Sequence, residues 1–112
     1  MITKESFEQL VISMKDMEEE LEIFNKSAEK IFGEDSTCMY YNPLRIVQSL
    51  IINVLQNEFN ETKEGAEWFV YEGFFQIENG GTSIEENGKI WDIKNIKDYY
   101  DYLVSLQKIN RI

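Results

Sequence analysis

Residues 4–32 carry an apolar stripe with the spacing of one long amphipathic helix. The stripe alternates steps of three and four residues, and most acidic side chains of the segment fall outside it. Its members are Phe7, Leu10, Met14, Met17, Leu21, Phe24, Ala28 and Ile31. Thr3 is a suitable N-cap and Gly33 a suitable stop. A helix of about 40 Å needs packing partners, so the stripe packs either on other helices of the same chain or on a second copy.

A second helix is predicted over residues 43–59. Asn42 and Pro43 match an N-cap followed by proline at the first helical position. The apolar residues that follow at helical spacing make a broad stripe, which is typical of a central helix with several neighbours. Residues 33–41, which include the single cysteine Cys38, are expected to form a loop.

Asn87-Gly88 is the strongest turn signal in the sequence. This dipeptide favours a two-residue type I′ turn and predicts a β-hairpin of residues 82–86 and 89–93. In that register Ile84 lies opposite Trp91, and the flanking pairs are Glu86 with Lys89 and Thr82 with Ile93. The face with Ile84, Trp91 and Ile93 is then expected to pack on the helices.

A last helix is predicted to begin at Asn95, with Asp98 as its capping-box acid. Its apolar stripe consists of Ile96, Tyr99, Tyr100, Leu103, Leu106 and Ile109. Residues 65–76 form an aromatic run that is compatible with a short helix or with a strand, and Thr62 as a cap favours the helix. The expected fold is therefore one domain, residues 1–112, of the mainly α (α+β) class. It is a small bundle of three to four helices with one β-hairpin before the C-terminal helix.

Charge and composition exclude several classes of function. Eleven Lys and Arg face twenty-one Asp and Glu, so the net charge is −10. The excess of acids is equal in the two halves of the chain. This balance argues against direct contact with nucleic acid or with an anionic membrane. The sequence has no histidine and one cysteine, which removes the usual general base and zinc ligands. We expect no enzyme, no cofactor and no metal site.

The aromatic segments resemble a known group of proteins. Trp68, Phe69, Tyr71 and Glu72 form a Trp-Phe-x-Tyr-Glu segment, a glycine-containing turn and a hairpin ending in Ile-Trp-Asp-Ile follow, and Tyr-Tyr-Asp-Tyr-Leu (99–103) closes the pattern. Residues 62–106 are thereby similar to the small acidic proteins of phages and prophages of low-GC Gram-positive bacteria. These are mostly of unknown function. The resemblance implies a phage setting, and no catalytic residue is carried over.

The leading hypothesis is a non-enzymatic phage accessory protein that acts by binding another protein in the bacterial cytoplasm. Its most specific form is an inhibitor of a nucleic-acid-directed host defence, whose acids attract a basic nucleic-acid-binding host protein. The competing explanation is that the acids only keep the protein soluble. The alternative function is a structural or assembly protein that dimerises through its first helix. The candidate partner-binding residues are Glu18, Glu19, Glu22, Glu61, Glu64 and Glu67.

Overall fold

A computed structural model describes residues 2–33 and 42–108 of the chain. The loop predicted around Cys38 and the end of the stripe at Ile109 lie outside these residues. The elements follow in the order α1 (Lys4–Phe32), α2 (Asn42–Phe59), α3 (Lys63–Trp68), the π-helical segment η2 (Phe69–Gly73), α4 (Phe74–Glu78), β1 (Thr82–Glu86), β2 (Lys89–Ile93) and α5 (Ile96–Leu106). The predicted fold class, mainly helical with one hairpin before the C-terminal helix, is confirmed.

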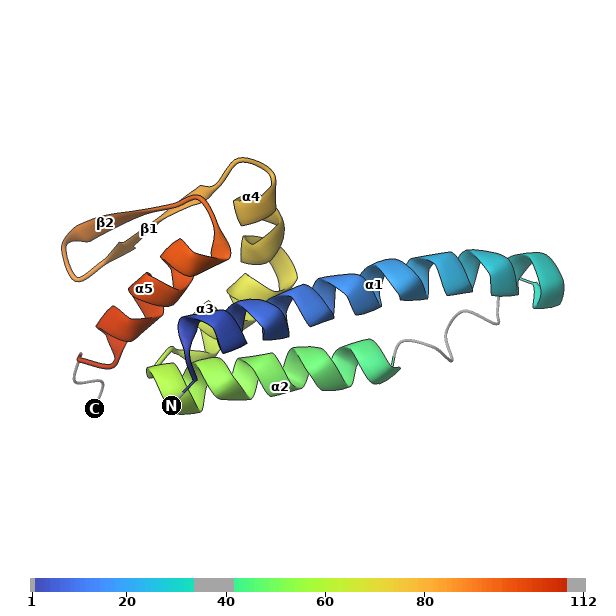
Figure 1. Cartoon of the computed structure of the whole chain (residues 1–112), viewed down its shortest axis with the longest axis horizontal. Coiled ribbons are helices and arrows are strands. Elements are labelled where there is room, and N and C mark those ends of the chain that lie inside the picture. Colours follow the sequence, from blue (N-terminus) through green and yellow to red (C-terminus); the bar gives the residue numbers. More distant parts are fainter. Residues whose placement is uncertain (1, 34–41, 109–112) are drawn as a thin grey trace.

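The molecule is elongated because α1 is longer than everything packed against it. α2 lies beside α1, α5 contacts the N-terminal part of α1, and the hairpin packs on α5 (Figure 1). The overall extents are 52 × 29 × 23 Å. The radius of gyration is 16.0 Å, above the roughly 13 Å of a compact chain of this length. The C-terminal part of α1 extends beyond α2 and the rest of the body.

The apolar stripe of α1 has a buried part and an exposed part. Phe7 and Met14 are fully buried, and Leu10, Met17 and Leu21 pack against the same core from its margin. Beyond Leu21, Phe24 keeps 49% and Ile31 72% of its surface exposed. The stripe therefore packs inside the chain up to residue 21. Thr3 and Gly33 cap the helix as predicted.

The core is organised around the ring of Phe7. This ring lies within 6.3 Å, centroid to centroid, of four aromatic rings from three other segments: Phe59, Phe69, Tyr99 and Tyr100. Phe69 and Tyr99 stack on each other at 4.1 Å with nearly parallel planes. The aromatic residues of the second half of the chain are mostly core residues for this reason.

The ambiguous residues 65–76 are helical. Thr62 caps α3, since its hydroxyl accepts a hydrogen bond from the backbone N–H of Gly65. The helical path then widens into η2 and returns to α geometry in α4. Gly73 is required at the end of η2 because a Cβ there would lie 2.6 Å from the indole ring of Trp68.

The hairpin and the last helix form as expected. The register pairs Ile84 with Trp91, as predicted, and Ile93 on the same face is fully buried. Asn95 caps α5 by accepting from the N–H of Asp98. The Asp98 carboxylate accepts from the N–H of Lys94, one residue before the cap.

Two contacts join the first and last helices. The hydroxyl of Tyr100 donates to the backbone carbonyl of Ile2 at 2.8 Å. Lys4 forms an ion pair with Asp101 at 2.8 Å. The N-terminal end of α1 is thus held against α5 by polar contacts as well as by the Phe7 cluster.

The division of α1 predicts unequal effects of truncation along one helix. Met14→Ala removes a buried side chain and is expected to lower the free energy of unfolding by about 2–5 kcal/mol. Ile23→Ala, where the side chain is 68% exposed, is expected to change it by less than about 0.5 kcal/mol. Urea unfolding followed by circular dichroism measures both values. Similar losses in the two variants would contradict the division.

Candidate functional site: an acidic cleft and an acidic helix surface

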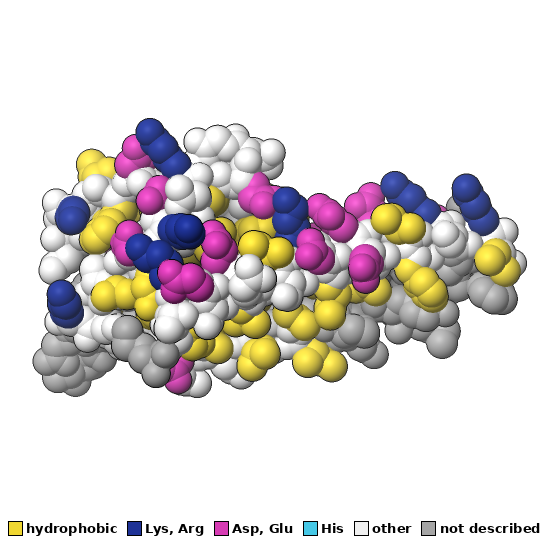
Figure 2. All heavy atoms as spheres, viewed as in Figure 1, with side chains coloured by type: hydrophobic (Ala, Val, Ile, Leu, Met, Phe, Trp, Pro, Cys, Tyr) yellow, Lys and Arg dark blue, Asp and Glu magenta, His cyan; other side chains and the backbone are white. Residues whose placement is uncertain are grey.

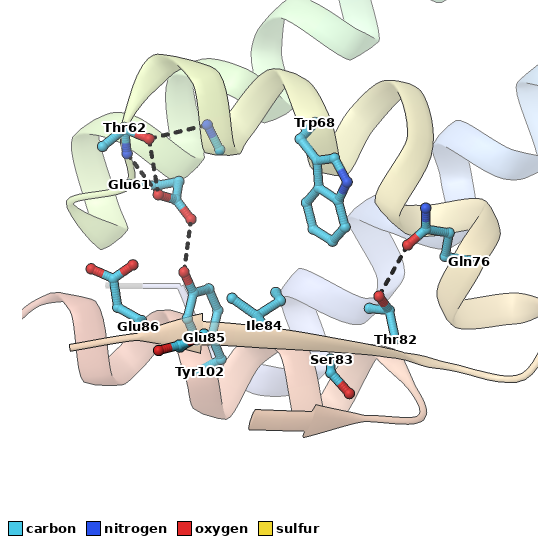
Figure 3. Close-up of a pocket in the computed structure, with 11 residues that line it drawn as sticks. Glu61, Thr62, Trp68, Gln76, Thr82, Ser83, Ile84, Glu85, Glu86 and Tyr102 are labelled. Atoms are coloured by element: carbon cyan, nitrogen blue, oxygen red, sulfur yellow. Dashed lines mark hydrogen bonds between the residues drawn. The ribbon is translucent and has the colours of Figure 1, made fainter. Parts of the chain in front are cut away.

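A cleft of about 420 Å³ lies between β1 and the helices α3 and α4. It is called the Glu61 cleft here. Figure 3 shows the carboxylate of Glu61, in the loop before α3, and the indole of Trp68, in α3, pointing toward β1. Tyr102 of α5 points toward Glu61 from the opposite side. The residues that line it are Glu61, Thr62, Gly65, Trp68, Gln76, Thr82, Ser83, Ile84, Glu85, Glu86 and Tyr102.

Glu61 is the buried charged residue of the described core, with 9% of its surface exposed. One carboxylate oxygen accepts from the backbone N–H of Thr62 at 2.7 Å. The other accepts from the hydroxyl of Tyr102 at 3.5 Å. A Cβ on Gly65 would lie 2.6 Å from the carboxyl group, so glycine leaves the space that this carboxylate occupies. These contacts stabilise a charge that burial alone would disfavour.

A hydrogen bond between elements lies at each end of the Glu61 cleft. The hydroxyl of Tyr102 donates to Glu61 at one end, and at the other the hydroxyl of Thr82 donates to the side-chain oxygen of Gln76 at 3.0 Å. Three glutamates line the cleft and no lysine or arginine does. The lining therefore has the charge and the aromatic surface to hold a cation.

Tyr99 lies next to the Glu61 cleft in the core. Its side chain is fully buried, and among the described residues its hydroxyl has no hydrogen-bond partner. Burial raises the pKa of Tyr99 well above its usual value, and the charge of Glu61 and the neighbouring Tyr102 add to this shift. The hydroxyl therefore stays protonated and carries a desolvation cost.

A second acidic feature, called the α1–α4 surface, surrounds a hollow of about 230 Å³ between these helices. It is formed by Lys15, Glu18, Glu19, Glu22, Phe74, Phe75 and Glu78. Lys15 bridges to Glu78 at 2.9 Å, and the ring of Phe75 is 44% exposed. Partial burial raises the pKa of Glu18, and repulsion from Glu22 and Glu19 adds to the shift. Figure 2 shows acidic side chains gathered along the middle of α1.

The structure separates the six predicted partner-binding residues. It brings Glu18, Glu19 and Glu22 together on the α1–α4 surface. Glu61, Glu64 and Glu67 recur every three residues but do not form one exposed row, because the carboxylate of Glu61 turns inward and accepts from the N–H of Thr62, the N-cap of α3. Glu64 is exposed, and Glu67 forms an ion pair with Lys63 at 3.9 Å. Whether any of the six contacts a partner stays a prediction.

Sequence reasoning missed the Glu61 cleft. Tyr102 lies outside the apolar stripe of α5, yet it is buried because the Trp91 ring packs edge-on against it at 5.8 Å. Trp68 belongs to an aromatic set for which the sequence leaves core packing and a protein-binding patch open, and neither reading places it beside Glu61 in a cleft. A signal was present in Gly65, whose position four residues after Glu61 leaves room for a carboxylate at the helix start.

Within residues 2–33 and 42–108, no group of three cysteine or carboxylate side chains is arranged to hold a metal ion. None of the helices in this part of the chain combines the length and the apolar character that crossing a bilayer requires. Comparisons with protein-family models, with curated proteins and with solved structures find no match to this chain.

The orphaned hydroxyl gives a prediction about stability. Tyr99→Phe keeps the stacked ring and removes the unpaired group, so we expect the free energy of unfolding to rise by about 1 kcal/mol. Because the pKa of Tyr99 is raised in the folded protein, its hydroxyl ionises at a lower pH in the unfolded state than in the folded state. The free energy of unfolding therefore falls as the pH rises past about 10. This loss should be smaller in Tyr99→Phe. Urea unfolding at neutral pH and above pH 10 measures both effects.

Tyr100→Phe is the matched control for this experiment. It removes a hydroxyl that donates to Ile2, so it is expected to lose about 1 kcal/mol where Tyr99→Phe gains. A loss of stability in Tyr99→Phe at neutral pH would show that its hydroxyl is satisfied in solution.

Proposed function

We propose that this chain is a non-enzymatic phage or prophage accessory protein that acts by binding a basic protein of the host. The observation that carries the proposal is the α1–α4 surface. It combines four carboxylates, one lysine and an exposed aromatic ring. Aromatic anchors surrounded by charged groups are typical of protein interfaces. The resemblance of residues 62–106 to small acidic phage proteins supplies the setting.

The electrostatics of this surface favour a cationic partner. Partial burial raises the pKa of Glu18, and repulsion from Glu22 and Glu19 adds to the shift. A lysine or arginine from a partner would relieve that repulsion. The wider charge of −10 attracts a basic protein over a longer range and speeds its association at low salt. A host protein that normally grips nucleic-acid phosphates carries such a basic surface. Blocking that surface would inhibit a nucleic-acid-directed defence.

Capture of a partner from bacterial lysate tests the proposal. The tagged chain is expected to retain one basic nucleic-acid-binding protein at low salt and to lose it at high salt, since screening weakens exposed charge pairs. Replacing Glu18, Glu19 and Glu22 together by glutamine is expected to weaken the complex about tenfold or more. The measurement is the dissociation constant of the purified pair at two salt concentrations.

A charge-matched variant is the control. Glu5, Glu29 and Glu58 are exposed and lie outside the α1–α4 surface. Changing these three to glutamine also moves the net charge from −10 to −7. This control should bind much as the unchanged chain does. Equal weakening in both triple variants would mean that total charge, rather than this surface, governs binding. Capture of no basic protein under any salt condition would contradict the proposal itself.

A second candidate function is self-association through the exposed part of α1. Ile23, Phe24 and Ile31 leave large apolar areas at the surface. Residues 21–32 hold two glutamates and two lysines, so this part is neutral within a strongly acidic chain. A second copy can approach it without strong charge repulsion. Exposed apolar surface of this kind is often covered in an assembly.

This candidate predicts a dimer, and its test is the molar mass in solution. Light scattering after size exclusion should give about twice the 13.3 kDa of one chain, and Phe24→Asp combined with Ile31→Asp should restore the mass of a monomer. Helical content by circular dichroism checks that the variant is folded. A monomeric unchanged chain at high concentration would rule out the assembly function.

A further inference from the structure

The outer edge of β1 carries backbone groups without partners in the sheet. Asn87 and Gly88 both have positive φ, 54° and 80°, as a type I′ turn requires. In such a hairpin the residues that flank the turn, Glu86 and Lys89, form a hydrogen-bonded pair, and bonded and non-bonded pairs then alternate. The N–H and C=O groups of Ser83 and Glu85 therefore point away from β2.

The residues that carry these groups line the Glu61 cleft. All five residues of β1 line the cleft and no residue of β2 does, so the cleft runs along the outer edge of β1. In Figure 3 the side chains of Thr82, Ile84 and Glu86 point toward α3, whereas that of Ser83 points the other way. Ser83 and Glu85 have exposed side chains. Their contribution to the lining is their backbone, and no other described segment forms a backbone hydrogen bond with it.

The side chains that line the Glu61 cleft favour a positively charged ligand. Glu61 presents a carboxylate at the end of the cleft where it accepts from Tyr102, and Glu86 points toward the cleft from β1 (Figure 3). The Trp68 indole supplies an aromatic wall for the stem of a long cationic side chain. The β1 edge of a second copy would bring its own Glu85 and Glu86 into this acidic lining. Repulsion therefore disfavours edge-to-edge pairing of two copies.

We propose that β1 accepts an extended segment of a partner protein as a third strand, with a lysine or arginine side chain of that segment directed at Glu61. Adding a strand to a free sheet edge is a recurrent mode of peptide recognition, in which the main chain gives affinity and side-chain pockets give selectivity. A cleft of about 420 Å³ falls within the range of ligand sites, roughly 300–1,000 Å³. This inference shares one premise with the proposed function, namely that the chain acts by binding another protein.

The probe is an array of peptides of about six residues, the usual length of a strand. Valine and threonine flank one variable position, which is lysine, arginine, glutamate or leucine. The full chain is expected to bind the lysine and arginine peptides at least about tenfold more tightly than the others. Absence of this preference would overturn the proposal.

Amide hydrogen exchange on the unchanged chain tests the mode of binding. With the best peptide bound, the exchange of the Ser83 and Glu85 amides should slow about tenfold or more as these groups become hydrogen-bonded. The amides of Ile90 and Asp92, which face outward on the free edge of β2 by the same alternation, should not change. Binding without protection at Ser83 and Glu85, or with protection on β2, would overturn strand addition.

Two proline variants test the edge directly. Proline is tolerated at edge positions whose N–H points out of the sheet. Ser83→Pro removes a donor on the cleft side and should weaken peptide binding about tenfold or more. Ile90→Pro makes the same change on the far edge and should bind like the unchanged chain. Equal binding by the two variants would overturn the proposal. Circular dichroism checks that Ser83→Pro is folded. If it is not, Glu86→Gln is tested in its place, and this variant is expected to show a weaker preference for the lysine peptide.

The triple glutamine variant of the α1–α4 surface separates this inference from the proposed function. That variant should bind the peptides as the unchanged chain does, because Glu18, Glu19 and Glu22 lie outside the Glu61 cleft. Peptide binding without capture of any basic host protein would leave strand addition standing and remove the proposed function. Capture of a partner without peptide binding would do the opposite.

Discussion

The ring of Phe7 is the contact on which the arrangement of this chain depends. It touches aromatic rings from α2, from η2 and from α5, so one side chain near the start of α1 holds three later segments together. Phe69 and Tyr99, stacked at 4.1 Å, complete the group. Such contacts combine burial of large apolar surfaces with geometry that favours particular ring orientations.

Glu61 is the polar counterpart of that cluster. It lies where α2 ends and α3 begins, and Asn60 before it adopts positive φ to make the turn. Its carboxylate joins the loop to Tyr102 of α5, and the same group gives the neighbouring cleft its negative charge. One residue therefore contributes both to stability and to the electrostatic character of the candidate site. This double role explains why its replacement by a neutral residue is a poor first test of binding.

Most of the fold was predictable because its signals are local. Thr3, Thr62 and Asn95 each cap a helix as expected, and Asn87-Gly88 fixed the register of the hairpin. The long stripe of α1 was ambiguous, because its spacing is the same whether it packs on α2 or on another chain. Among the described residues, burial along the stripe stops near Leu21, where α1 extends beyond α2. The open choice between helix and strand for residues 65–76 arose because an aromatic run fits either periodicity.

The candidate site was harder to predict than the fold. Glu61, Glu64 and Glu67 repeat every three residues, which suggested one acidic row. Glu61 precedes α3 and turns inward, so the regular spacing does not place the three glutamates on one face of a helix. The Glu61 cleft joins residues from four elements, and no pattern in the sequence brings Trp68, Tyr102 and the edge of β1 together. Their proximity is a product of tertiary packing.

The contacts between the first and last helices bear on how the protein is made. The hydrogen bond from Tyr100 to Ile2 closes a separation of 98 residues, and the Phe7 cluster needs Tyr99 and Tyr100 of α5. During synthesis Phe59 and Phe69 can reach Phe7 before α5 is made, whereas Tyr99 and Tyr100 become available only with α5. Folding then depends on contacts that are distant in sequence, which slows the search relative to a bundle built from adjacent helices. A nascent chain interrupted before α5 would expose the part of the apolar side of α1 that packs on α5, next to Phe7, and such a fragment would be a natural target for chaperones and proteases.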